Sequence, residues 1–364
     1  MEAQEWLKLA TSVPRSYVAS KRFRTRPMQA IIDLTMKCPA SCEYCATWRI
    51  EHENLTTDQV GDILAKLRKI GVQVVAFSGG EPLIRKDVPE LVRRARRLGM
   101  LASTITSGLV NKADVFRDLM ESGLSTLTFT IDGIDKAMHE SFRSGTSFDK
   151  VIQAVERALA VRAEHGFTTR INSQSVITRN NVHALGAIAD MVRDLGVDHC
   201  SFQPVWPTTG DHDFIEKFGF DANDRELLEQ ARDALRAIPQ ANLQEYVDLL
   251  PDFYLDYPKI QRELECYAGR AFVHVDYKGD LLPCALYHES FGSLLDHEPE
   301  ELLQGERYDR MLREAAAHET CGGCSLTCHM ERNIMVRAVT RPAAMRQLLT
   351  ARFKRRNARR AAGA

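Results

Sequence analysis

Residues 28 to about 205 alternate short β-rich runs with amphipathic helical patterns, and this alternation most limits the possible fold. Several runs are continuously apolar, as strands buried in a parallel sheet are. A glycine often separates a helix from the next strand, as in Lys69-Ile70-Gly71. Because β/α units connect by right-handed crossovers, the pattern predicts an α/β fold whose parallel sheet curls into part of a barrel. The six expected strands are Gln29–Thr35, Val72–Phe77, Leu101–Thr106, Ser125–Ile131, Thr168–Ile177 and Val197–Val205.

Length and composition exclude several other classes of protein. The 364 residues are 44% hydrophobic and 27% charged, which fits a soluble folded chain and excludes disordered and collagen-like ones. No stretch approaches the ~18 apolar residues of a membrane span. The polar start of the chain lacks the apolar core of a signal peptide. We therefore expect a cytoplasmic protein.

The net charge of −1 conceals an uneven distribution. Residues 333–364 carry nine basic and no acidic side chains, which leaves 39 basic against 49 acidic residues in 1–332. A solvated terminus is the interpretation that this basic tail favours. A helix in weak contact with an anionic membrane is the alternative, and no nucleic-acid partner is expected.

The alternating pattern ends near residue 206, where a loop rich in proline, glycine and aspartate leads into helices. Farther on, Ala271 to Leu282 predicts a hairpin around Lys278-Gly279. We expect five regions: an N-terminal extension (1–27), the partial barrel (28–210), a helical linker (211–265), a small α+β cysteine-bearing domain (266–332) and the basic tail (333–364).

The nine cysteines are clustered, which favours metal ligation over a disulfide framework. Cys38, Cys42 and Cys45 form C-x3-C-x2-C directly after the first expected strand. Three thiolates are too few for a closed zinc site but can hold a cubane iron–sulfur cluster with one iron open to another ligand. The alternative is a zinc site completed by His52 or by a remote cysteine.

This spacing, with Tyr44 before the last cysteine, resembles the signature of the radical S-adenosylmethionine (radical SAM) enzymes. The resemblance implies a partial (β/α)6 barrel, a [4Fe–4S] cluster on Cys38, Cys42 and Cys45, and SAM bound to that cluster. Other matching segments follow later strands in the family's order, and they supply the residues expected at the SAM site: Tyr44, Gly79, Gly80, Glu81, Pro82, Ser107, Asp132 and Arg143.

The resemblance also assigns roles to these residues. Ser78 to Pro82 matches the family's GGEP segment, whose glycines allow close backbone approach and whose carboxylate and carbonyls take the SAM ammonium. Ser107 stands where the family often has asparagine. Arg143 would face the SAM carboxylate, which its bidentate fork suits.

The five cysteines between residues 266 and 328 form a second set, which resembles the C-terminal SPASM/twitch modules of radical SAM enzymes. No cysteine follows Cys328, which favours the shorter twitch form with one auxiliary [4Fe–4S] cluster. Cys328 is either spare or replaces Cys324 or Cys266, and a structural zinc ribbon is the alternative to a cluster. The best-matching ligands are Cys266, Cys284, Cys321 and Cys324. Cys200 is expected to be a buried packing residue, with hydrogen-atom donation by Cys200 or Cys328 as the alternative.

The resemblance implies an enzyme that reductively cleaves SAM to a 5′-deoxyadenosyl radical, which abstracts hydrogen from an unactivated C–H bond. A flavodoxin or ferredoxin would supply the electron, and the auxiliary cluster would assist net oxidation or rearrangement. Because only about 27 residues precede the first strand, we expect a small-molecule substrate such as a sugar, cyclitol or natural-product intermediate. The alternatives are a peptide or protein maturase, a lipid-modifying enzyme at the membrane surface, and a non-enzymatic zinc-binding module associated with nucleic acid.

Overall fold

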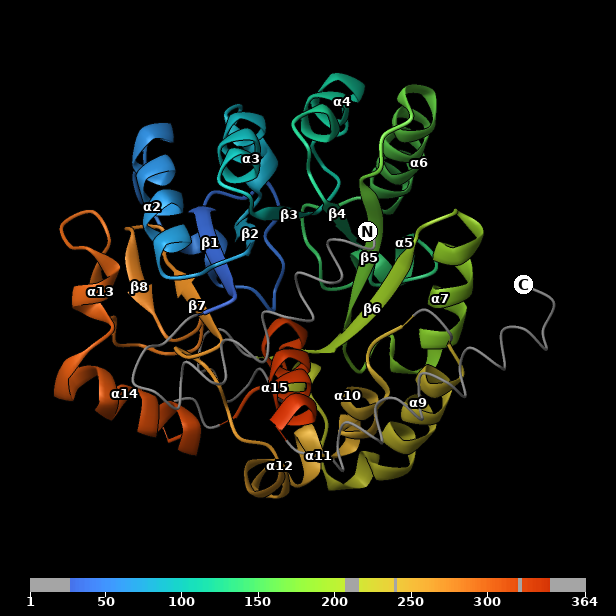
Figure 1. The fold of residues 1–364 in the computed structure, drawn as a ribbon. Helices are drawn as coiled ribbons and strands as arrows, with labels where there is room; N and C mark the ends of the chain where they lie inside the picture. The colour runs from blue at the N-terminus through green and yellow to red at the C-terminus, as the bar shows by residue number, and fades with distance from the viewer. Residues whose placement is uncertain (1–26, 207–215, 239–240, 320–322, 341–364) are drawn as a thin grey trace.

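A nine-stranded sheet organises the protein in the computed structural model, which describes residues 27–206, 216–238, 241–319 and 323–340 (Figure 1). The strand order is β6-β5-β4-β3-β2-β1-β7-β8-β9, and the first six strands are parallel, as the sequence predicts. The sheet curls without closing, so the predicted partial barrel is confirmed. The strands are β1 Gln29–Thr35, β2 Val74–Gly79, β3 Leu101–Thr106, β4 Thr126–Thr130, β5 Arg170–Ile177, β6 His199–Pro204, β7 Phe272–Val275, β8 Asp280–Leu282 and β9 Gly292–Ser293.

Helices cover the convex side of this sheet (Figure 1). The first begins at a capping box in which Thr56 and Gln59 satisfy each other's backbone N–H groups. The helices between barrel strands are α2 Thr57–Lys69, α3 Val88–Arg97, α4 Ala113–Glu121, α5 Lys136–Glu140, α6 Phe148–His165 and α7 Leu185–Asp194. Later helices are α9 Arg225–Ala237, α10 Gln244–Asp248, α11 Leu250–Leu255, α12 Tyr257–Glu263, α13 Pro299–Leu302, α14 Gly305–Ala317 and α15 Thr327–Thr340. Short 3₁₀ turns lie at Thr47–Arg49, Pro82–Ile84, Val182–Ala184 and Ala222–Asp224.

The two faces of the barrel strands differ in polarity. Ile32, Phe77 and Phe129 are fully buried in the core that joins the sheet to its helices. Along each strand, the residues that alternate with these buried ones are only partly buried. They line the concave face of the sheet, and the space that this face surrounds is here called the lumen. Many luminal residues are polar, among them Asp33 and Thr128. The barrel therefore surrounds a polar space and not a second apolar core.

Strand β7 extends the barrel sheet because it pairs in parallel with β1, with Ile31 opposite His274. It also forms the predicted hairpin with β8, in which His274 lies opposite Leu282. The sequence predicts the hairpin but not its attachment to β1. This attachment places the cysteine-bearing C-terminal region directly beside the first barrel strand.

Helix α15 spans the gap between the two ends of the barrel (Figure 1). Near its start, the Thr327 backbone N–H donates to Gln203 Oε1 of β6 at 3.1 Å. One turn later, Arg332 Nε donates to Gln29 Oε1 of β1 at 2.6 Å. The boundary expected at residue 332 falls inside this helix, so residues 333–340 are structural; the rest of the predicted basic tail, 341–364, lies outside the described residues.

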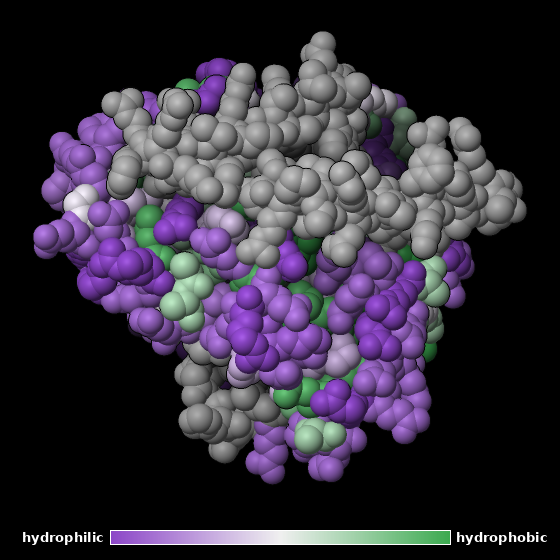
Figure 2. Space-filling model, turned by 60° about the horizontal axis from the view of Figure 1, so that its bottom comes forward, coloured by the Kyte–Doolittle hydropathy of each residue, from purple (hydrophilic) through white to green (hydrophobic). Residues whose placement is uncertain are grey.

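The described surface is largely hydrophilic on the face shown in Figure 2. Among the residues that the structure describes, the exposed large hydrophobic side chains are Ile84, Ile134 and Leu295. No helix in these ranges is long and apolar enough to cross a membrane.

Replacing Asn333 tests the structural role of α15. Its buried Oδ1 accepts the Tyr267 backbone N–H at 2.9 Å. Asn333→Ala removes this acceptor, and we expect the free energy of unfolding to fall by about 1–3 kcal/mol. Urea unfolding followed by circular dichroism measures the change. The control, Arg225→Ala, removes only a 3.9 Å exposed ion pair with Glu229, and equal unfolding midpoints for the two variants would contradict this role.

Candidate active site

The loop that carries Cys38, Cys42 and Cys45, here called the cysteine loop (residues 38–45), follows β1 at the carboxyl end of the barrel. On one side, backbone N–H groups of Ser41 and Glu43 donate to carbonyls in the segment after α5, at 2.7 and 2.9 Å. On the other side, the N–H groups of Gly80 and Glu81 donate to the carbonyls of Thr35 and Lys37, just before the loop, at 2.6 and 2.9 Å. Backbone contacts with the end of β2 and with the segment after α5 therefore hold the loop in place.

Gly79 and Gly80 are required by this close approach. A Cβ atom on Gly80 would lie 2.3 Å from the Lys37 carbonyl oxygen, and one on Gly79 would lie 2.1 Å from that of Thr35. Gly79 also has a φ of +111°, which side-chain-bearing residues rarely adopt. The glycines predicted to admit SAM thus also allow the end of β2 to pack directly on the cysteine loop.

Glu81 is buried and connects the ends of β2 and β3. Its Oε2 accepts the backbone N–H and the hydroxyl of Ser107, at 2.7 and 2.5 Å, and its Oε1 accepts the Leu83 N–H at 3.1 Å. Pro82 follows Glu81 and begins a 3₁₀ turn. A carboxylate offers about four acceptor positions, so Glu81 retains capacity for one further donor, such as an ammonium group.

Asp132 is the centre of a buried network beneath the cysteine loop. Its Oδ2 accepts the Tyr44 hydroxyl at 3.1 Å and also Arg143 Nε. Its Oδ1 accepts the Val176 backbone N–H at 2.7 Å. The side chain has no exposed surface, so Asp132 orients Tyr44 and Arg143 from below.

Two further residues position Asp132, and sequence reasoning did not assign them this role. The Asp132 N–H donates to His139 Nδ1 at 3.1 Å, and Asn181 Nδ2 donates to the Asp132 carbonyl at 2.9 Å. Burial and the neighbouring Arg143 lower the pKa of His139 to about 4, which keeps its ring neutral and able to accept this bond near pH 7. Asn181 follows β5 in a polar Thr-Arg-Asn-Asn run. This run of polar residues after a strand end was the sequence feature that could have indicated its place at the site.

Arg143 places a positive charge beside the cysteine loop. Its Nη1 lies 3.9 Å from Cys42 Sγ, and its guanidinium stacks 5.5 Å from the centre of the Tyr44 ring. Burial raises the pKa of the Cys42 thiol, and Arg143 opposes that shift. Burial also raises the pKa of Cys38 to about 11. The free thiols of Cys38 and Cys42 are therefore largely protonated, and metal binding would displace their protons.

The donors of the cysteine loop fit a cluster better than a single zinc ion. Within the described ranges, no three His, Cys, Asp or Glu side chains converge closely enough to hold one metal ion. A cubane requires wider spacing, because its cysteine ligands bind separate iron atoms. His52, the alternative zinc ligand, uses its Nε2 to accept the Met36 backbone N–H at 3.1 Å. The three thiols and the adjacent cation together suit the predicted cluster.

The C-terminal cysteines form a second group. Cys266, Cys284 and Cys324 line one small cavity together with His318 and His329. The predicted fourth ligand, Cys321, lies outside the described residues. Cys328, in the first turn of α15, is not among the residues lining this cavity.

His329 contacts this second group. Its Nδ1 lies 3.8 Å from Cys324 Sγ, and its ring stacks on Phe272 at 4.7 Å. Burial lowers the pKa of His329 to about 3, so the ring is neutral at physiological pH. Cys200, by contrast, is buried in the main core, far along the sheet on β6. Its packing agrees with the sequence-based expectation.

Asp33 and His274 form a hydrogen-bonded pair between the two groups of cysteines. His274 Nε2 lies 2.8 Å from Asp33 Oδ2, which links β7 to β1. Burial disfavours the charged imidazole, but Asp33 outweighs burial and raises the pKa of His274. Sequence reasoning missed this pair because it did not predict the pairing of β7 with β1.

These features define an iron–sulfur enzyme of the SAM-dependent radical type: a partial parallel barrel, three thiols after its first strand and a glycine–glutamate segment after its second. Residues 32–173 match the radical SAM superfamily, and residues 266–325 match the SPASM iron–sulfur cluster-binding domain. The chain belongs to the radical SAM superfamily. It is thus an enzyme that uses SAM, a [4Fe–4S] cluster and an auxiliary iron–sulfur centre.

Two curated relatives align with most of the chain. A PqqA peptide cyclase from Streptomyces rochei is 31% identical over 71% of this chain and 69% of the relative. A PqqA peptide cyclase from Xanthomonas campestris is 27% identical over 82% of this chain and 79% of the relative. These are the proteins that the chain resembles in sequence.

Solved structures share the fold at lower sequence identity. SuiB from Streptococcus suis, bound to the precursor peptide SuiA, is 16% identical with a TM-score of 0.65, covering 90% of this chain and 76% of SuiB. AnSMEcpe with bound AdoMet is also 16% identical, with a TM-score of 0.61, covering 89% of this chain and all of that protein. Both comparisons confirm the fold.

A methyl group at Gly80 should prevent the cysteine loop from docking. In Gly80→Ala, the added Cβ would overlap the Lys37 carbonyl, so we expect anaerobically prepared protein to lose about four iron atoms per chain. Iron and sulfide analysis measures this loss, and circular dichroism checks that the chain has folded. Gly186→Ala is the matched control because nothing lies within 4 Å of its added Cβ. Full iron content in Gly80→Ala would show that the close approach is dispensable.

Proposed function

We propose that this protein is a radical SAM enzyme that modifies a peptide. The observation that carries the proposal is its similarity to PqqA peptide cyclases, one of them 31% identical and another aligned over 82% of this chain. The longer alignment is too extensive to reflect the SAM-binding barrel alone, which matches the superfamily over residues 32–173.

This proposal replaces the small-molecule substrate expected from the sequence. That expectation depended on the short segment before β1, which says little about how the lumen binds its ligand. The relatives favour the alternative, a peptide maturase. A partly open barrel with a polar lumen also suits a substrate that presents one side chain while the rest of its chain remains outside.

In this proposal, Cys38, Cys42 and Cys45 hold the SAM-binding cluster. When bound there, the cluster and SAM supply a 5′-deoxyadenosyl radical that removes a hydrogen atom from the substrate. Arg143 provides positive charge beside Cys42 and a donor for the SAM carboxylate. Glu81 and the backbone around Gly79 and Gly80 provide acceptors for the SAM ammonium.

Cys266, Cys284, Cys321 and Cys324 would hold one auxiliary [4Fe–4S] cluster. His329 lies against Cys324 and can hydrogen-bond to its sulfur, an interaction that tunes cluster reduction potentials. Phe272 fixes the plane of the His329 ring by stacking.

The pair formed by Asp33 and His274 is placed to accept a proton from the substrate. Net oxidation of a C–H bond removes a hydrogen atom, then an electron and a proton, so the site needs a base besides an electron acceptor. Asp33 lies on the luminal face of β1, and its carboxylate orients and stabilises the His274 imidazolium. We assign the proton to His274 Nδ1, a buried atom without a hydrogen-bond partner in the described part of the chain.

Replacing Cys38, Cys42 and Cys45 together by alanine tests the SAM site. We expect iron to fall from about eight to about four atoms per chain, because only the SAM-binding cluster is lost. Reductive formation of 5′-deoxyadenosine should fall below detection. Chromatography of dithionite-reduced reactions measures this product, and its continued formation would contradict the assignment.

Comparing Cys284→Ala with Cys328→Ala tests the auxiliary ligands. We expect Cys284→Ala to lose about four iron atoms, whereas Cys328→Ala keeps about eight, because Cys328 does not line the second cavity. Iron analysis and electron paramagnetic resonance of the reduced proteins distinguish the two results. Iron loss in Cys328→Ala would identify it as a ligand.

The substrate class can be tested by coexpression with the short peptides encoded next to the gene. We expect mass spectrometry to show one peptide that loses two hydrogen atoms, as a new cross-link or double bond requires. The triple cysteine variant provides the inactive control. Unchanged peptides together with a modified small metabolite would contradict the proposal.

A further inference from the structure

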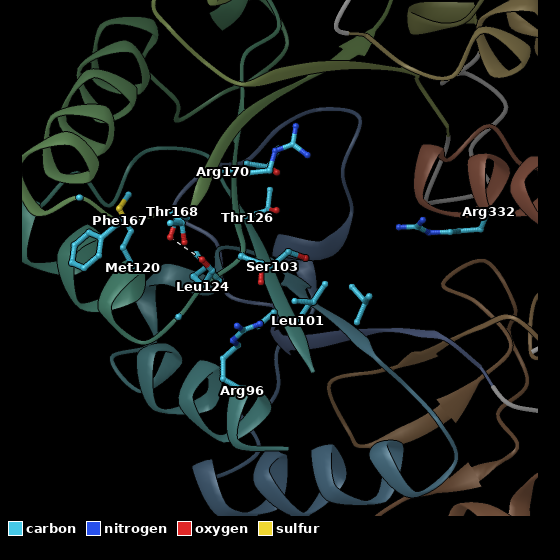
Figure 3. Close-up of a pocket in the computed structure, with 17 residues that line it drawn as sticks. Arg96, Leu101, Ser103, Met120, Leu124, Thr126, Phe167, Thr168, Arg170 and Arg332 are labelled. Atoms are coloured by element: carbon cyan, nitrogen blue, oxygen red, sulfur yellow. Dashed lines mark hydrogen bonds between the residues drawn. The ribbon is translucent and has the colours of Figure 1, made fainter. Parts of the chain in front are cut away.

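A cavity of about 700 Å³ opens at the end of the lumen opposite the cysteine loop (Figure 3). The first residues of β3, β4 and β5 line it, and α15 contributes Arg332. Its size lies in the range of binding sites for small ligands or short peptide segments. None of the residues assigned to either cysteine group lines it, so it is separate from the sites described above.

The charges around this cavity are of one sign. Three arginines line it, and the described lining residues include no aspartate or glutamate. Figure 3 shows Arg332 extending from α15 towards the strands, and Arg96 extending towards Ser103 from the other side. Backbone and side-chain donors surround the arginines, including the hydroxyl groups of Ser103, Ser125, Thr126, Thr128 and Thr168.

Arg170 and Arg332 are the arginines that can reach a ligand within the lumen. Arg170 is the first residue of β5, and no described side chain forms an ion pair with it. Arg332 uses Nε to bind the uncharged side chain of Gln29, and no carboxylate in the described ranges forms an ion pair with it. Partly buried guanidinium groups facing a shared cavity favour an anionic ligand, and carboxylates match their planar geometry.

We propose that this cavity binds an acidic segment of the peptide substrate through Arg170 and Arg332. This inference rests on the proposed peptide-modifying function and specifies its substrate class. The protein's own N-terminal segment does not have the charge that this cavity favours, because residues 1–26 carry six basic and only two acidic side chains. An external peptide with glutamate or aspartate supplies the missing negative charge.

Strand register gives the length of strand between the level of Arg170 and the carboxyl end of β1. Arg170 lies opposite Thr126, and the same row continues through Ser103 and Ala76 to Ile31. Ile31 precedes the end of β1 by four residues, about 13 Å along a strand. An extended peptide that runs from the level of this row towards the carboxyl end of the barrel covers that rise with about four residues.

The test uses fluorescein-labelled peptides with alternating Glu-Ala or Gln-Ala sequence and the fully reconstituted enzyme under anaerobic conditions. Fluorescence anisotropy should show at least tenfold tighter binding of the Glu-Ala peptide. Arg170→Gln should weaken that binding at least tenfold. Arg225→Gln is the control because its single ion pair lies on exposed α9. Arg332→Gln provides a second test of the same cavity, with circular dichroism to confirm folding.

Equal binding of the two peptides, or unchanged binding in both cavity variants, would overturn the proposal. Displacement of the peptide by equimolar citrate would also overturn it, because the cavity would then recognise a free carboxylate and not a peptide. The substrate-independent formation of 5′-deoxyadenosine should be unchanged in Arg170→Gln, since Arg170 lies at the opposite end of the lumen. If the unsubstituted enzyme itself forms no 5′-deoxyadenosine, the proposed function is refuted, and this result is independent of peptide binding.

Discussion

The buried carboxylate of Asp132 is the interaction on which the geometry of the active site depends. Its two oxygens bind Tyr44 of the cysteine loop, Arg143 after α5 and the Val176 backbone in β5. Removing one partner of a buried ion pair costs about 3–5 kcal/mol, because the remaining charge is left without compensation. The network therefore couples three segments that are remote in sequence. It also holds the Arg143 guanidinium beside Cys42, where a cluster bound by thiolates needs positive charge.

The incomplete barrel makes α15 as important as the strands. The six barrel strands do not close on themselves, and α15 bridges the last and first of them through Gln203 and Gln29. The same helix carries His329 against Cys324 at one end and Arg332 into the opposite cavity. One helix thus closes the lumen, supports the second cysteine group and contributes charge to the proposed peptide site. A change in the position of α15 would affect all three, so barrel closure and the second cysteine group are structurally linked.

The local sequence pattern was sufficient to predict the six barrel strands. The apolar runs that mark the strands, and the glycines that end the helices, can each be recognised within a few residues. The cysteine spacing after the first strand indicated where the cysteine loop lies, whereas Glu81 was singled out by the resemblance to the radical SAM family. The pairing of β7 with β1 could not be predicted, because it joins residues about 240 positions apart and leaves no local periodicity. The Asp33–His274 pair depends on that pairing and was missed for the same reason. The resemblance implied that Gly79 and Gly80 allow close backbone approach at the SAM site. Their contact with the Thr35 and Lys37 carbonyls was not predicted, because it requires the tertiary structure.

The lumen has different chemistry at its two ends, and this difference constrains how a substrate can bind. At the carboxyl end lie the cysteine loop and the Asp33–His274 pair, to which the proposed function assigns radical and proton chemistry. At the amino end, three arginines and several hydroxyl groups offer only binding. The row of residues through Arg170 lies four residues, about 13 Å of strand, before the end of β1, and an extended peptide can span that rise. A substrate that used both ends would therefore be chain-like, with an acidic residue several positions away from its reacting carbon.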